Sequence, residues 1–250
     1  MRLELILAAV VPALLLLIQV YRADRLEKEP AAMLLGLVFW GMVATELAAV
    51  AEQGGILLLE KLVKPEQSSF WSFSWGVMNP ARAKVTNLHD LLLNFVVVAV
   101  SEEGIKYLFL RFRTWKSPEF NCTFDGLVYA VFLSLGFALW ENIRYALANG
   151  MATALARAVT AVPGHGCFGV FMGIWFGLAK RASLHGKKGK SLCFRILAVL
   201  IPVLLHGTYD YVASSELTRL GWLFLPFVAC MFVVSYLLVR VMSRFDRYMK

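Results

Sequence analysis

Residues 126–147 read GLVYAVFLSLGFALWENIRYAL, a mostly apolar stretch that is long enough to cross a lipid bilayer as a helix. A helical span needs about 20 predominantly apolar residues to cover a hydrocarbon core of about 30 Å. Further stretches of similar length and character occur along the chain: Leu3–Tyr21, Ala31–Ala51, Leu91–Leu110, Ala156–Ala179, Leu192–Ala213 and Leu220–Val241. The sequence therefore predicts an all-α, polytopic membrane protein with about seven transmembrane helices, in which residues 1–250 form a single integral membrane domain.

The composition supports this prediction. Hydrophobic residues make up 59% of the chain, charged residues 17%, and the mean hydropathy is +0.66. Soluble domains contain about 45–50% apolar and about 25% charged residues, so the composition argues against a soluble domain. The first stretch could also be a signal peptide, but Glu4 in its n-region and the lack of a small-residue cleavage site before Tyr21 favour a retained span.

The basic residues behind the net charge of +8 lie mainly in the connections between the predicted spans. The basic residues flank spans and form no compact basic face, so we expect no nucleic-acid partner. An N-terminus outside and a C-terminus in the cytoplasm would place about twice as many Lys and Arg residues inside as outside, as the positive-inside rule requires. The four cysteines lack CxxC spacing, which argues against a disulfide framework or a cysteine-ligated zinc site.

Ionisable residues within the predicted spans are the main functional signal, because charges in a bilayer are costly and usually functional. The third span contains Glu102, Glu103 and Lys106. Glu102 and Lys106 lie four residues apart and share a helix face, whereas Glu103 is rotated by about 100° and is expected to point elsewhere. A buried ion pair that only locks helix packing would explain Glu102 and Lys106, but it would leave Glu103 without a role.

The next three spans each add a histidine or a carboxylate. Glu141 and Asn142 lie in the fourth, His165 in the fifth, and His206 and Asp210, which share a helix face, in the sixth. Each residue alone would more often serve packing, but imidazoles and carboxylates together are the ligand types that zinc uses in catalytic sites. At about 1.5 Å per residue, these side chains fall in the middle or outer part of the membrane, so they could converge on one cavity open to the outside. Gly169, Gly173 and Gly177 follow at intervals of four and predict a face for close helix packing.

Five motifs in order resemble those of the PrsW family of bacterial intramembrane proteases. Glu102-Glu103-x-x-Lys106 resembles the family's EExxK motif, and residues 124–130 read FDGLVYA where the family has FDGLVYG. Residues 136–145 resemble its GFAxxENIxY motif. His165 with Gly173 resembles its HxxxxxxxG element, and His206 with Asp210 its HxxxD element. The resemblance covers about residues 91–213, which we expect to be the catalytic core.

The resemblance implies an intramembrane endopeptidase that hydrolyses peptide bonds of membrane-anchored proteins in a bacterial inner membrane. In the best-known role of the family, the substrate is a single-span anti-sigma factor, which receives its first (site-1) cut on its outer side during envelope stress. The wider superfamily includes the CAAX prenyl endopeptidases and bacteriocin-processing proteins, and sequence alone leaves a metal-dependent and a glutamate-based mechanism both open.

The roles expected on this basis are specific. Glu102, with Glu103, would activate water, Lys106 would set the charge of the glutamate pair, and Asn142 and Asp210 would orient the other groups. Glu141, His165 and His206 would bind zinc or hold the water directly. Asp125 and Tyr129 would give structural support. Two alternatives remain at this point: a proton- or cation-conducting transporter, and a scaffold whose polar residues only hold helices together.

Overall fold

The computed structural model describes residues 2–63, 88–214 and 221–249, and the regular structure in these ranges is helical. The helices are α1 (Arg2–Ala23), α2 (Ala31–Leu62), α3 (Leu88–Leu91), a π-helical segment (Leu92–Ala99), α4 (Val100–Thr114), α5 (Asp125–Asn149), α6 (Met151–Val159), α7 (Ala161–Leu184), α8 (Lys188–Ser214), a 3-10 turn (Gly221–Leu223) and α9 (Phe224–Arg244). Six stretches of the described chain are helical, long and apolar enough to span a membrane: α1, α2, α5, α6 with α7, α8 and α9. This confirms the all-α, polytopic prediction.

Two predicted spans differ in detail from the structure. Leu91–Leu110 is helical, but it is divided among α3, the π-helical segment and α4, and it carries the charged residues that lower its hydropathy. The predicted span Ala156–Ala179 contains a break at Thr160, where α6 ends and α7 begins. Pro163 lies in the first turn of α7, where its missing N–H is tolerated, whereas one long helix through this point would lose a hydrogen bond.

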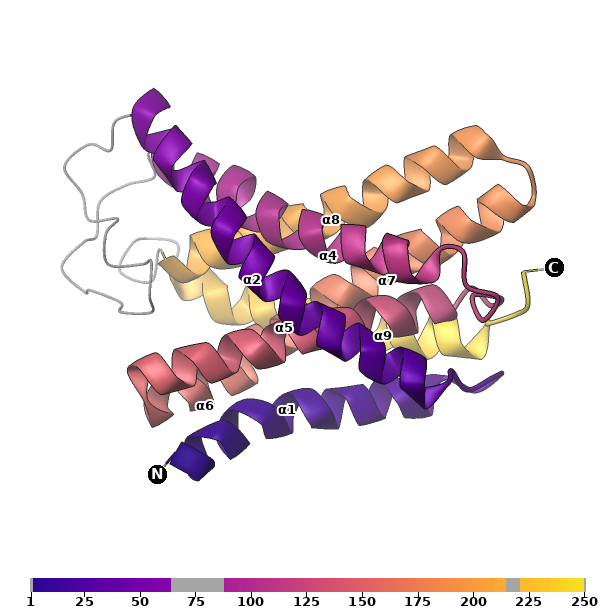
Figure 1. The fold of residues 1–250 in the computed structure, drawn as a ribbon, viewed down its shortest axis with the longest axis horizontal. Coiled ribbons are helices and arrows are strands. Elements are labelled where there is room, and N and C mark those ends of the chain that lie inside the picture. Colours follow the sequence, from indigo (N-terminus) through magenta and orange to yellow (C-terminus); the bar gives the residue numbers. More distant parts are fainter. Residues whose placement is uncertain (1, 64–87, 215–220, 250) are drawn as a thin grey trace.

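Helix α5 forms the centre of the bundle, with α1 and α2 running along it (Figure 1). In the most apolar part of α5, 83% of the residues are buried, against 22% in the corresponding parts of α1 and α9. Helix α5 is therefore an interior helix, whereas α1 and α9 face the bilayer. The backbones of α2 and α7 approach the backbone of α5 closely at glycine residues. A Cβ at Gly136 would lie 2.2 Å from the Val38 carbonyl oxygen on α2, and a Cβ at Gly173 would lie 2.4 Å from Leu127 Cα. The glycines of α7 therefore serve helix packing, as predicted.

The α1–α2 connection, the start of α5 and the C-terminal segment meet at one end of the bundle, where Asp246 accepts a hydrogen bond from the Phe124 N–H at 2.9 Å. Asp125 Oδ2 accepts hydrogen bonds from the backbone N–H groups of Asn121 (2.9 Å) and Cys122 (2.6 Å). The Tyr129 hydroxyl donates to Glu29 Oε2 at 2.6 Å. Asp125 and Tyr129 thus hold loops onto the helix bundle, which agrees with the structural role expected for them.

Asp24 in this region is buried at an electrostatic cost to the fold. Its carboxylate is buried, and neither oxygen has a hydrogen-bond partner within the described chain. Burial raises the pKa of the Asp24 carboxyl from 3.8 to about 6. Because the folded state binds this proton more tightly than the unfolded state, the carboxylate destabilises the fold progressively as the pH rises through this range, and fully above about 6.

We therefore expect Asp24→Asn to raise the thermal unfolding temperature in detergent at pH 8, with a gain that disappears as the pH approaches 4. The matched control is Glu27→Gln, because Glu27 is exposed and accepts a hydrogen bond from Asn121 at 3.2 Å. A gain for Asp24→Asn that is the same at both pH values would show that its charge is not the cause.

Candidate active site

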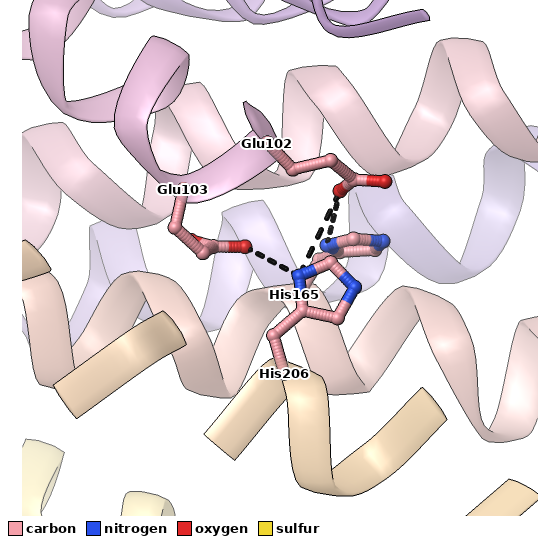
Figure 2. A group of neighbouring side chains, drawn as sticks. All are labelled: Glu102, Glu103, His165 and His206. Atoms are coloured by element: carbon pink, nitrogen blue, oxygen red, sulfur yellow. Dashed lines mark hydrogen bonds and ion pairs between the residues drawn. The ribbon is translucent and has the colours of Figure 1, made fainter. Parts of the chain in front are cut away.

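Five ionisable side chains from three helices meet inside the bundle. Helix α4 contributes Glu102, Glu103 and Lys106, α7 contributes His165, and α8 contributes His206. Figure 2 shows the two glutamates directed toward the two imidazole rings. All five residues are buried, and Glu103 and Lys106 are 0% exposed. A π-helical segment, a feature frequent at functional sites, leads directly into the turn that carries the glutamates.

Lys106 joins both glutamates, and the prediction that Glu103 points elsewhere is wrong. The Lys106 Nζ lies 3.1 Å from Glu102 Oε2 and 2.8 Å from Glu103 Oε1. Lys106 follows Glu103 by three residues and Glu102 by four, so its long side chain lies over the gap between them. Adjacent carboxylates thereby share one polar centre although their helix positions differ by about 100°.

Each histidine has one ring nitrogen toward this centre and the other toward an outer carboxylate. His206 Nδ1 lies 2.9 Å from Glu103 Oε1, and its Nε2 lies 3.2 Å from Asp210 Oδ2. His165 Nδ1 lies 3.0 Å from Lys106 Nζ, and its Nε2 lies 3.0 Å from Glu141 Oε2. Because an ammonium group only donates, Nδ1 of His165 accepts and its Nε2 carries the proton given to Glu141. The lone pair of His165 therefore faces the centre, as a metal ligand requires.

Glu141 lies outside the centre, which revises its predicted role. Besides His165, it pairs with Arg157 on α6, whose Nη2 is 2.6 Å from Glu141 Oε2. The groups that come within 4.8 Å of one another are instead Glu102, Glu103, His165 and His206. Glu141 contacts the His165 ring as Asp210 contacts the His206 ring, so of the expected ligands Glu141, His165 and His206 only the two histidines belong to this group.

Asn142 is not brought to the site. Its side-chain amide donates to the carbonyl of Ala9 on α1 at 3.2 Å, and the residue is 0% exposed. Glu141 and Asn142 are adjacent, so when Glu141 faces the interior of the site, Asn142 turns toward α1. The expected orienting role of Asn142 is therefore replaced by a contact between helices.

The four central residues suit a divalent metal ion in their chemistry. Two imidazoles and two carboxylates are ligand types of zinc. Glu103 Oε2 is buried and has no hydrogen-bond partner in the described part of the chain, so it has a lone pair available for a further contact. Lys106 supplies a positive charge to the same carboxylates, and a metal at this site would share them with its ammonium group.

A cavity of about 200 Å³ reaches this centre and gives access to Glu102, His165 and His206. Its wall also includes residues that the sequence analysis did not select: Glu52, Arg157 and Tyr209. Glu52 follows the predicted end of the second span at Ala51, but α2 continues to Leu62 and carries Glu52 into the wall. Arg157 lies at the start of the predicted span Ala156–Ala179, and only the position of α6 shows that it pairs with Glu141.

We expect Asp210→Asn to reduce activity by about 10- to 100-fold, because the carboxylate that fixes the His206 ring would be lost. Asn142→Ala is the matched control among the expected orienting residues. It should cost about 1 kcal/mol of stability through the lost bond to Ala9 and leave the turnover rate per folded molecule nearly unchanged. Initial rates normalised to folded protein distinguish the two, and an equal loss in both variants would contradict the geometry described above.

Comparison with known proteins gives a consistent result. The sequence model of the PrsW family of intramembrane metalloproteases matches residues 29–239. A Protease PrsW of Geobacillus kaustophilus is 33% identical over 213 residues, which cover 85% of this chain and 81% of the relative. A Protease PrsW of Halalkalibacterium halodurans is 36% identical over 159 residues (64% and 72%), and one of Bacillus subtilis is 29% identical over 224 residues (90% and 88%). No solved structure matches the chain.

Proposed function

Because this chain belongs to the PrsW family of intramembrane metalloproteases, we propose that it makes the first, outer-side cut in a single-span membrane protein of the anti-sigma-factor class. The observation that carries the proposal is the buried centre of Glu102, Glu103, His165 and His206 at the end of a cavity. The transporter and scaffold alternatives are not needed once the family is known.

Glu102 is the better placed of the two glutamates to act as general base. It lines the cavity and is 6% exposed, whereas Glu103 is fully enclosed and bonded to Lys106 and His206. In the proposed reaction Glu102 takes a proton from water as the water oxygen attacks the scissile carbonyl carbon. The same proton then passes to the amide nitrogen as the C–N bond breaks, which leaves a carboxylic acid and an amine.

The residues around Glu102 position the reacting groups. The ammonium of Lys106, 3.1 Å from Glu102 Oε2 and 2.8 Å from Glu103 Oε1, offsets the negative charge of both carboxylates, so that Glu102 can stay ionised as a base requires. Asp210 and Glu141 fix the ring orientations of His206 and His165. Glu103, His165 and His206 would hold a zinc ion. When bound, zinc lowers the pKa of water and polarises the carbonyl group.

The position of the cavity supports an outer-side cut. Its lining residues Glu52, Glu141 and Asp210 lie in the C-terminal halves of α2, α5 and α8. With the N-terminus outside and the C-terminus in the cytoplasm of a bacterial inner membrane, those halves all face outward. Under that topology, the cavity would receive a peptide segment from the outer side of the membrane.

The test is cleavage of a co-reconstituted single-span anti-sigma factor in liposomes, with the new N-terminus identified by sequencing. The proposal predicts one cut on the outer side, close to the membrane. The comparison substrate is an unrelated single-span protein with the same flanking charges. If both substrates are cut equally, the substrate class is wrong although the proteolysis stands.

A further inference from the structure

A second concave region lies on the membrane-facing side of the bundle, between α4 and α8. This groove of about 440 Å³ is formed largely by apolar side chains: Val100, Leu192, Ile196, Val199, Leu200 and Val203. Leu192, Ile196 and Leu200 each leave about half of their surface uncovered by protein. In a membrane, such a groove is filled by hydrocarbon, because leaving apolar surface without contacts would forfeit dispersion energy.

One end of the groove is strongly basic. Arg111 on α4 and Arg195 on α8 both line it. Tyr107 lies in the same groove, close enough to interact electrostatically with both guanidinium groups. Arg195 packs over the Trp115 ring at 5.6 Å and donates to the Ser191 carbonyl. In the described ranges no carboxylate lies within ion-pair distance of either arginine. Two guanidinium groups without an anion favour a ligand that supplies one.

The depth of the two arginines matches a lipid headgroup. At about 1.5 Å per residue, Arg111 lies about 14 Å along α4 from Glu102, and Arg195 lies about 17 Å along α8 from His206. Half of the hydrocarbon thickness is about 15 Å. If the catalytic centre is near the middle of the bilayer, both arginines therefore reach the phosphate level of one leaflet, while Val100 and Val203 line the groove closer to the catalytic centre.

From the groove, its two arginines and their depth, we infer that the α4–α8 groove binds an anionic glycerophospholipid. Arg111 and Arg195 hold its phosphate, and an acyl chain lies along the apolar residues of the groove. Basic pockets between membrane helices are known to select anionic headgroups, and guanidinium groups match phosphate geometry. The lipid would also brace α4 against α8, the two helices that the Glu103–His206 hydrogen bond of 2.9 Å joins at the catalytic centre.

The test is thermal unfolding of the full chain in a neutral detergent, titrated with phosphatidylglycerol or with phosphatidylcholine. Phosphatidylglycerol should raise the unfolding temperature of the wild type, and Arg111→Gln with Arg195→Gln should weaken its apparent affinity at least ten-fold. The matched control is Arg113→Gln, which removes the same charge from α4 at a position packed over the Trp40 ring on α2. This control should respond as the wild type does.

A second double variant keeps the test decisive if the double glutamine variant folds poorly. Arg111→Lys with Arg195→Lys keeps both charges, and it should bind phosphatidylglycerol more weakly than the wild type and more tightly than the double glutamine variant. Equal stabilisation by the two lipids, or the same phosphatidylglycerol affinity in all variants, would overturn the inference. If the arginines instead seat the substrate helix, their loss would raise KM without changing lipid affinity, which also overturns it.

Discussion

Glu102→Gln is expected to lower the rate of peptide hydrolysis by about 10²–10⁴-fold, the range typical of losing a general base. Glutamine has nearly the same shape and can still accept a hydrogen bond from Lys106, so the fold should persist. The rate should fall because the glutamine amide cannot take a proton from water at the cavity surface, where Glu102 lies. Rates of substrate cleavage in liposomes, normalised to folded enzyme, measure this effect.

Glu46→Gln provides the control for Glu102→Gln. Glu46 is also a glutamate on a membrane helix, but it is outward-facing and paired with Trp140 (2.6 Å) and Arg144 (3.0 Å) on α5. Its replacement should leave cleavage within a few-fold of the wild type. If Glu102→Gln retains wild-type activity while Glu103→Gln loses it, the general base would be Glu103, and the assignment based on cavity access would be wrong.

Lys106→Met is expected to destabilise the protein by about 3–5 kcal/mol, because it removes one partner of a buried charge network and leaves the others unpaired. Lys106 is 0% exposed, and its ammonium group lies 3.9 Å from the centre of the Phe137 ring. Solvent therefore does not reach this position to compensate for the lost ammonium group. Glu102 and Glu103 would then face each other without the cation that joins them. Unfolding in a denaturing detergent titration measures the loss.

Combining Lys106→Met with Glu103→Gln should restore much of this stability, since the added substitution removes the carboxylate closest to the missing ammonium. If the double variant is less stable than Lys106→Met by the full cost of Glu103→Gln alone, the two residues do not interact energetically. That result would contradict the network described here.

The sequence was sufficient for the helical membrane fold, and it selected most of the residues that the structure brings together in the candidate site. Spans of about 20 apolar residues can be recognised from local composition alone. Residues such as His165 and His206 stand out because charged and polar side chains are rare within such spans. The central position of α5 was not predictable, because its apolar residues resemble those of the lipid-facing helices. Only packing against α2 and α7, through contacts such as that of Gly136, distinguishes it.

The errors at the site arose from side-chain reach and from helix boundaries. Helical angles separate Glu102 from Glu103, but the length of Lys106 brings them together again. Glu141 and Asn142 are neighbours in one motif, yet they face different helices, and only the position of α1 shows which faces outward from the site. Glu52 was missed because α2 continues as a helix beyond its apolar segment.

The most direct test of the account is cleavage by the reconstituted protein before and after metal chelation, with zinc then added back. The account predicts that wild-type cleavage is lost on chelation and restored by zinc. His165→Ala with His206→Ala should retain less metal in elemental analysis and should show no cleavage under either condition. Cleavage that persists at the wild-type rate after the metal has been removed, or in the double histidine variant, would contradict the claim that this centre holds the metal and performs the hydrolysis.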